Sequence, residues 1–275
     1  MPKDNVYTIT PPKNLVCLDW GELWRYRELL YTFAWRDVKV RYKQTVLGVG
    51  WAIFQPLFTM IIFTVFFGNL AKIPSEGVPY PIFVYTGLLL WNYFSTSLSS
   101  ASSCLVDNEN IIKKVYFPRL LLPLSTAVTP LVDFGFSLII FFGLSLIFGY
   151  VPCVIGILLL PVLLFCSFLT ALGVGLFLGS INAKYRDVRY ILPFFIQLLM
   201  YVTPVIYPSS IIPESYRWVS FLNPMAGVIT MARGGFLYGI IDFNLLAMTF
   251  GISVLFFMFG LAYFRKTERF LADTL

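Results

Sequence analysis

The stretch Trp35–Trp51, WRDVKVRYKQTVLGVGW, joins the densest run of positive charge in the chain to its first long apolar segment. From residue 47 to residue 70 no charged side chain interrupts that segment. A bilayer core of about 30 Å is crossed by ~20 apolar residues in a helix. Lysines and arginines that flank such a segment are typical of its cytoplasmic side. The stretch therefore predicts a membrane protein whose N-terminal segment lies in the cytoplasm.

The composition of the whole chain agrees with a lipid environment. Of its 275 residues, 58% are hydrophobic and 12% charged, whereas a soluble domain has about 45–50% and ~25%. The net charge of +6 flanks apolar segments instead of clustering with exposed aromatic residues, so it indicates membrane topology and not nucleic-acid binding. The chain has no histidine, and its four cysteines are scattered. We therefore expect no histidine-dependent catalysis, no metal site and no disulfide framework.

Six apolar segments predict an all-α integral membrane fold with six transmembrane helices. The fifth segment is short and is interrupted by Pro193 and Pro204. Seventeen of the 20 lysines and arginines fall on one side of this arrangement, which places both termini in the cytoplasm. The predicted parts are a cytoplasmic segment 1–46, a transmembrane domain 47–264 and a cytoplasmic tail 265–275. The predicted spans are 47–70, 81–105, 120–148, 153–181, 190–207 and 243–264.

Residues 208–242 predict short helices half-inserted at the outer face and not a seventh span. The apolar residues 224–240 would rise only about 25 Å as a helix, and Gly227, Arg233 and two further glycines interrupt them. Irregular backbone at membrane depth is tolerated where protein or water covers it.

Residues 22–43 predict an amphipathic helix that lies along the cytoplasmic leaflet. At 100° per residue, one face is polar and the opposite face is apolar. Asp37 and Arg41 interrupt the apolar face and, being four residues apart, are expected to pair. The polar face holds Arg25, Glu28, Thr32, Arg36, Lys39 and Lys43, and the apolar face Leu23, Tyr26, Leu30, Phe33, Ala34 and Val38.

Asp133 is the one acid well inside an apolar segment. A buried, unpaired carboxylate is costly, so Asp133 should face a protein interior or a wet cavity. A bond to a neighbouring helix and a contact with a transported substrate are both open, and Pro130 before it predicts either a helix kink or a pathway-lining site. No second acid accompanies Asp133, so the sequence predicts no catalytic site. No GxxxxGK[ST] motif occurs either, so the chain should not bind ATP through a phosphate loop of its own.

The segment LVDNENIIKKVYFPRLLLP, residues 105–123, predicts a short cytoplasmic helix between two spans. Asp107 or Asn108 can cap it, and Pro118 stops it. The residues alone leave two interpretations equally open, a helix that docks into a partner or an ordinary positively charged loop.

Four motifs resemble the ABC-2 type polysaccharide-export permeases, the family that exports O-antigen, capsule and teichoic acid. They are RDVKVRYKQTVLGVGWAIFQPL at 36–57, NENIIKKVYFPRLLLPL at 108–124, AKYRDVRYILPFF at 183–195, and TPVIYPSSIIP with FLNPMAG and Arg233 within 203–233. They follow the family's order, and the resemblance extends over the chain from about residue 25.

The resemblance implies a homodimer in the bacterial cytoplasmic membrane, coupled to two separate ABC ATPase subunits that bind ATP and magnesium. The substrate it implies is a polysaccharide linked to undecaprenyl pyrophosphate. By resemblance, the segment 105–119 is the coupling helix seated in the ATPase, and 208–240 forms outer gate helices with Asn223, Pro224 and Arg233. The coupling residues are Asn108, Glu109, Ile111, Ile112, Lys113, Lys114 and Val115.

A sugar face stacks well on an aromatic ring, so a glycan path should be wet and lined by aromatic residues. Two other functions stay open, namely an ABC-2 exporter of a small molecule and a membrane enzyme acting on a polyprenyl carrier. The candidate glycan-path residues are Trp51, Phe54, Tyr93, Asp133, Tyr201 and Tyr207. The candidate cations for the pyrophosphate and the lipid interface are Arg36, Lys39, Arg41 and Lys43.

Overall fold

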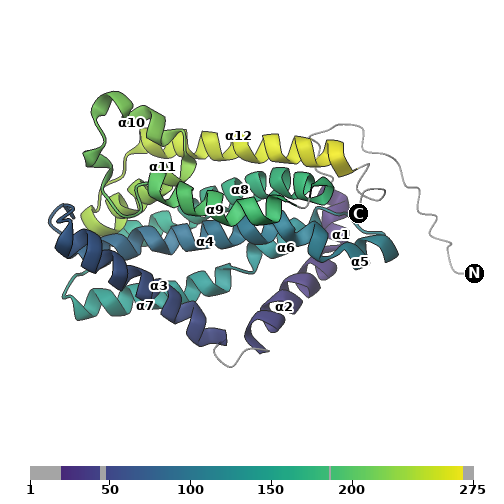
Figure 1. Cartoon of the computed structure of the whole chain (residues 1–275), viewed down its shortest axis with the longest axis horizontal. Coiled ribbons are helices and arrows are strands. Elements are labelled where there is room, and N and C mark those ends of the chain that lie inside the picture. Colours follow the sequence, from purple (N-terminus) through teal and green to yellow (C-terminus); the bar gives the residue numbers. More distant parts are fainter. Residues whose placement is uncertain (1–19, 44–47, 186, 269–275) are drawn as a thin grey trace, which may run out of the picture.

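The computed structural model describes residues 20–43, 48–185 and 187–268, and every regular element within these ranges is a helix (Figure 1). Four helical segments are long and apolar enough to cross a membrane, namely Gly50–Leu70, Leu121–Ile147, Val154–Lys184 and Phe243–Glu268. They coincide with four of the six predicted spans, which confirms an all-α membrane fold. Parts of the predicted N-terminal segment (1–19 and 44–46) and of the predicted tail (269–275) lie outside the described residues.

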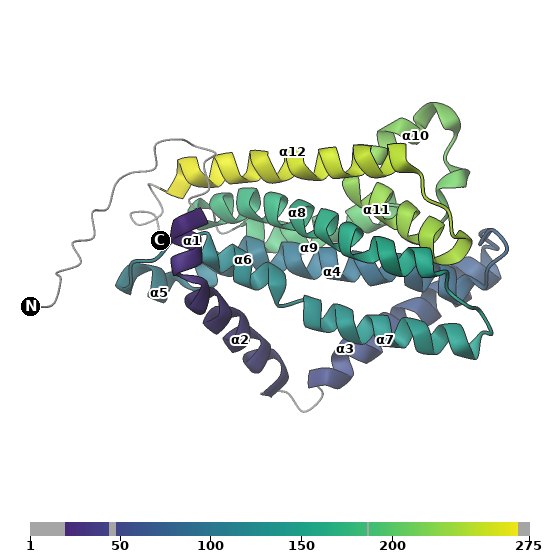
Figure 2. The ribbon, with the colours of Figure 1, turned by 180° about the vertical axis from the view of Figure 1, so that it is seen from behind.

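The helices run mostly lengthwise along an elongated bundle, with α1, α5 and the end of α12 at one end and α10 at the other (Figures 1 and 2). In chain order the elements are α1 (Trp20–Arg25), α2 (Arg27–Lys43), α3 (Gly48–Phe63), η1 (Thr64–Leu70), α4 (Tyr80–Asp107), α5 (Glu109–Lys114), α6 (Leu121–Val128), α7 (Leu131–Ile147), α8 (Val154–Lys184), α9 (Val188–Val202), η2 (Ser209–Ile211), α10 (Glu214–Phe221), α11 (Pro224–Arg233), η3 (Gly234–Tyr238) and α12 (Phe243–Glu268).

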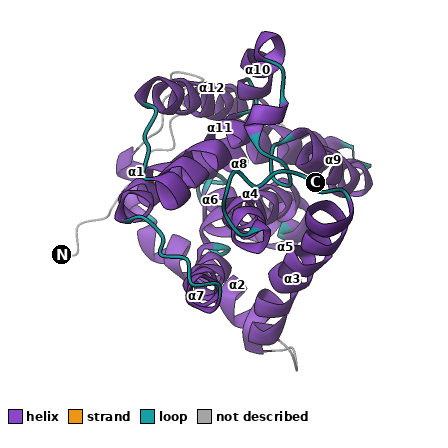
Figure 3. Cartoon of the chain, turned by 90° about the vertical axis from the view of Figure 1, so that its left-hand side faces the viewer, coloured by secondary structure: helices purple, strands orange, loops and turns teal. Residues whose placement is uncertain are grey.

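Helix α4 is the central helix of the bundle (Figure 3). It packs against α3, α6, α7, α8, α9 and α11, and most of its 28 residues are buried. Protein surrounds this helix, so it can carry many serine, threonine and tyrosine residues. With 28 residues, the helix is long enough for the predicted span 81–105. Because of its polar residues, it is not one of the four strongly apolar segments.

Helix α9, which corresponds to the predicted span 190–207, has 15 residues and ends at Val202. Fifteen residues rise about 22 Å, which is less than the hydrocarbon thickness of a bilayer. The count of six crossings therefore stays a prediction that depends on α4 and α9.

The predicted N-terminal helix is divided in two, since α1 and α2 are separated by a turn at Tyr26. Its apolar side does not remain free for lipid. Phe33 is buried and packs against Phe117, with 5.5 Å between the ring centroids. Leu23, Tyr26 and Leu30 pack on the same core cluster. Protein contacts thus take up much of the face that the sequence assigned to the membrane surface.

The predicted span 120–148 contains a break between α6 and α7 at Thr129 and Pro130, as the proline predicts (Figure 2). Beyond the break, α7 diverges from α4 toward α3.

Helices α8 and α12 are in close contact where two glycines meet. A Cβ atom on Gly260 would lie 1.9 Å from the carbonyl oxygen of Gly173, a distance that no side chain can adopt. Small residues at such crossings allow the backbones of membrane helices to approach each other closely. This contact fixes α12 against the bundle.

The region 208–242 contains two short α-helices, α10 and α11, as the sequence predicts, and no further long helix. Nearly all of α11 is buried, among α4, α8 and α12, whereas α10 is largely exposed.

Candidate functional site

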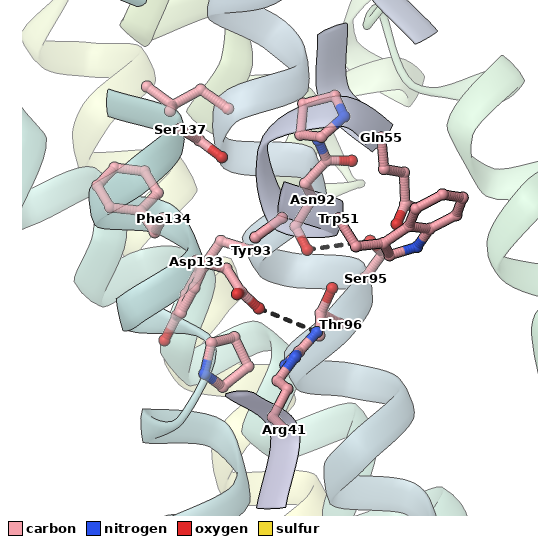
Figure 4. A pocket seen from close by; sticks show the side chains of 14 residues that line it. Arg41, Trp51, Gln55, Asn92, Tyr93, Ser95, Thr96, Asp133, Phe134 and Ser137 are labelled. Atoms are coloured by element: carbon pink, nitrogen blue, oxygen red, sulfur yellow. Dashed lines mark hydrogen bonds and ion pairs between the residues drawn. The ribbon is translucent and has the colours of Figure 1, made fainter. Parts of the chain in front are cut away.

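A cavity of about 380 Å³ lies between α3, α4 and α7, close to the end of α2 (Figure 4). It forms because α7 leans away from α4 beyond the break at Pro130. Its wall consists of Arg41, Trp51, Ala52, Gln55, Pro56, Leu89, Asn92, Tyr93, Ser95, Thr96, Pro130, Asp133, Phe134 and Ser137.

The wall of this cavity is more polar than the helices that form it. Within the described part of the chain, the side chains of Gln55, Asn92 and Thr96 form no hydrogen bond with another residue. Trp51 is 61% exposed beside them. Polar groups at membrane depth are costly unless they face water, a ligand or another polar group. The cavity therefore offers an aromatic face together with uncharged donors and acceptors.

Asp133 is held by two residues at the end of α2. A terminal guanidinium nitrogen of Arg41 lies 2.9 Å from Asp133 Oδ2, and the Tyr42 hydroxyl donates a hydrogen bond to Asp133 Oδ1. Burial, followed by this hydrogen bond to the carboxylate, raises the pKa of the Tyr42 phenol well above its usual value, so Tyr42 remains a donor. The bond to a neighbouring helix that the sequence left open is thus present in the structure.

The expected pair between Asp37 and Arg41 is wrong. Asp37 instead pairs with Arg36, at 2.8 Å, while Arg41 extends to Asp133 on α7. The spacing of four residues made the first pair possible, but the two carboxylates are about equally exposed (22% for Asp37 and 20% for Asp133), so the position of α7 and not a difference in burial decides the partner of Arg41.

Arg36 also connects α2 to the predicted coupling helix. Its guanidinium donates to Asn108 Oδ1 at 3.0 Å, and the Asn108 amide donates to the carbonyl oxygen of Cys104 at 2.9 Å. Asn108 occupies the N-cap position of α5, but its side chain does not cap the helix. Of the four cations predicted for the lipid pyrophosphate, Arg36 and Arg41 are therefore engaged within the chain, whereas Lys39 and Lys43 are exposed.

The predicted coupling helix forms as α5, but its apolar residues do not all face outward. Ile112 is buried in the protein core, and Ile111 packs against the same cluster. Val115 and Tyr116, which follow α5, are 57% and 64% exposed. The interpretation of Ile112 as a docking residue is thus corrected. The exposed residues of this segment are Asn110, Lys113, Lys114, Val115 and Tyr116, and Glu109 is partly exposed.

Only some of the predicted glycan-path residues meet at the cavity. Trp51, Tyr93 and Asp133 line it, although the Tyr93 hydroxyl is directed to the carbonyl oxygen of Ala127 at 3.2 Å. Phe54 lies outside the wall and is 46% exposed. Tyr201, at the end of α9, and Tyr207, whose hydroxyl donates to the carbonyl oxygen of Val202 at 2.9 Å, lie elsewhere.

Sequence reasoning missed the amide and hydroxyl residues of the cavity wall. A signal for them exists in the polar positions 92, 95, 96 and 99 of α4, whose spacing of three and four residues places them on one helix face.

The predicted outer-gate residues form a buried connection. Arg233 donates to the carbonyl oxygens of Phe83 (3.3 Å), Pro204 (2.7 Å), Val205 (2.5 Å) and Tyr207 (3.0 Å). Its guanidinium lies 3.6 Å from the centroid of the Phe83 ring.

Asn223 completes this connection at the other end of α11. Its side chain accepts from the backbone nitrogen of Met225 at 3.1 Å and donates to the Thr203 hydroxyl at 2.7 Å. Pro224 is buried at the first position of α11. Together with Arg233, these residues fasten the irregular backbone after α9 to α11 and α4.

Comparisons with known proteins agree with these features. A family model described as ABC-2 type transporter matches residues 28–237. The chain is 34% identical to the O-antigen export system permease protein RfbA of Myxococcus xanthus over 76% of this chain and 80% of that one. It is 27% identical to RfbA of Klebsiella pneumoniae, over 90% of this chain and 95% of the relative. It is also 25% identical to the polysialic acid transport protein KpsM of Escherichia coli, over 85% and 91% of the two chains.

Proposed function

Since the chain belongs to the ABC-2 type transporter family, we propose that it is the permease subunit of an ATP-driven exporter of polysaccharide across the bacterial inner membrane. The family is one of transporters, so the chain is a transport subunit and not an enzyme. The relatives named for O-antigen export and polysialic acid transport support a polysaccharide as the cargo.

The observation that carries this proposal is the cavity between α3, α4 and α7. Asn92, Gln55 and Thr96 offer unpaired amide and hydroxyl groups beside the exposed Trp51 ring. Sugars present hydroxyl groups at their edges and C–H groups on their faces, so this wall matches their chemistry. A small apolar drug would not need it.

We further propose that the glycan arrives on undecaprenyl pyrophosphate. Lys39 and Lys43 are exposed on α2, and basic side chains near the cytoplasmic leaflet attract anionic lipid headgroups. In this proposal the chain forms a homodimer of six-crossing subunits with cytoplasmic termini. Two ABC ATPase subunits bind ATP and magnesium and contact the surface around α5.

The test is export by the permease reconstituted in proteoliposomes with its ATPase. We expect a lipid-linked glycan to move across the membrane only when ATP and both proteins are present. Movement of a small drug but not of a glycan would favour the small-molecule exporter. Modification of the polyprenyl carrier by the permease alone would favour the membrane enzyme, which the engagement of Asp133 with Arg41 and Tyr42 argues against.

Coupling to the ATPase is tested at the exposed side chains next to α5. Replacing Val115 with aspartate and Tyr116 with alanine should abolish most export and release the ATPase from the purified complex, because both side chains are exposed where a partner would bind. The amount of ATPase that copurifies and the export rate are measured together.

The matched control for these variants is Val151→Asp. Val151 is 85% exposed in the connection between α7 and α8, outside both helices and away from α5. It should leave the copurified ATPase unchanged. Normal export and normal copurification in the Val115 and Tyr116 variants would show that the ATPase binds elsewhere.

A further inference from the structure

Charge is nearly absent from the described helices that are proposed to cross the membrane. In α3 no charged side chain occurs, and in α7 the only one is Asp133. In α4, α8, α9 and α12 the charged residues lie in the terminal turns. These are Asp107, Lys184, Arg189, Arg265, Lys266 and Glu268.

The two cations that reach the interior of the described bundle are both engaged. Arg41 at the edge of the cavity pairs with Asp133 at 2.9 Å, so the charges of this pair cancel. Arg233 is 4% exposed and donates to four carbonyl oxygens. It is enclosed by the protein and presents no positive surface to a passing molecule.

From this distribution we propose that the exported polymer is uncharged along its repeating unit, a chain of neutral sugars and not of sugar acids. The inference rests on the proposed function and specifies its substrate class. A polymer of sugar acids would place several carboxylates in the membrane at once, and each would need a cation or water in a poorly polarisable surrounding. A second copy of this chain would contribute the same uncharged walls.

The cavity wall is suited to neutral sugars for the same reason. Gln55 and Asn92 can each donate and accept, and Thr96 can do both through its hydroxyl. Such groups can form hydrogen bonds with sugar hydroxyls, and they place no fixed charge in the wall that would attract or repel a charged polymer. The relatives leave both substrate classes open, since one of them is named for the transport of polysialic acid, an acidic polymer.

The test compares two polymers that differ in one group. Galactose and galacturonic acid homopolymers of equal length, both linked to undecaprenyl pyrophosphate, are offered to the permease reconstituted with its ATPase. We expect the neutral polymer to be exported at least about tenfold faster, because each unpaired carboxylate raises the barrier at membrane depth. Equal or faster export of the acidic polymer would overturn the inference and leave the proposed function standing. Export of neither, with an active ATPase, would contradict both.

A pair of variants tests the role of charge in the wall. Gln55→Lys adds one cation to an exposed position of the cavity wall, and it should raise the ratio of acidic to neutral export severalfold. Gln55→Met has nearly the same length without the charge and should not raise that ratio. A ratio that stays the same in Gln55→Lys, while the neutral polymer is still exported, would overturn the inference.

Discussion

Replacement of Arg233 with leucine is expected to prevent stable assembly of the permease. The guanidinium satisfies the carbonyl oxygens of Phe83, Pro204, Val205 and Tyr207 in a buried site. Leucine would leave all four without this donor. Each buried group left unsatisfied costs about 1–3 kcal/mol, and native proteins are stable by only about 5–15 kcal/mol. The purified protein is heated to a series of temperatures, and size-exclusion chromatography measures the fraction that stays monodisperse. The thermal midpoint, the temperature at which half of this fraction is lost, should fall strongly.

Two further variants make this expectation specific. Arg233→Lys keeps the positive charge but replaces a planar fork of five donors with a single ammonium group, so its midpoint should lie between those of the wild type and the leucine variant. Arg27→Leu makes the same change at an exposed arginine and should alter the midpoint little. A wild-type midpoint in Arg233→Leu would mean that water or other groups replace the guanidinium and that the connection is not needed for stability.

Hydropathy and chain length predicted the peripheral helices and also the central one, since α4 forms at the predicted span 81–105, but α4 is not among the four strongly apolar segments. A helix that faces lipid must be apolar on its outer side, so α3, α8 and α12 are evident in the sequence. Helix α4 is surrounded by other helices apart from the cavity, and several of its hydroxyl side chains bond to the backbone of their own helix, as Thr86 does to the carbonyl oxygen of Ile82 at 2.8 Å. The interior position of α4 therefore weakens the signal that identifies a span.

The partners of charged residues could not be derived from spacing along one helix. Arg41 and Asp37 are correctly spaced for a pair, but the angle between α2 and α7 brings Asp133 within 2.9 Å of Arg41. The position of α2 also places Arg36 beside Asn108, between α4 and α5. Such contacts depend on how helices cross, which a linear pattern does not contain. Ile112 illustrates the same limit, because it is buried in a core cluster with residues of other helices, such as Phe33 and Leu105, which the sequence of α5 alone does not reveal.

The second large effect is expected at the ion pair between Arg41 and Asp133, which joins the end of α2 to the wall of the cavity. Reversing either charge alone should lower export more than about tenfold, because the remaining charge then faces a like charge at the same distance. The side chains are 41% and 20% exposed, so solvent screens the pair in part and the protein should still fold. Export in proteoliposomes and the thermal midpoint are both measured for each variant.

Exchange of the two charges, Arg41→Asp with Asp133→Arg, separates the ion pair from the individual side chains. If the attraction between α2 and α7 is what matters, the exchange should recover a substantial part of the export that each single reversal loses, and the coupling between the two positions is read from the double-mutant cycle. Recovery should be incomplete, because Tyr42 donates to Asp133 and would lose its acceptor. Tyr42→Phe in the wild-type background measures that contribution alone. An exchange variant no more active than the single reversals, with an unchanged thermal midpoint, would mean that the carboxylate of Asp133 acts at its own position and not through α2.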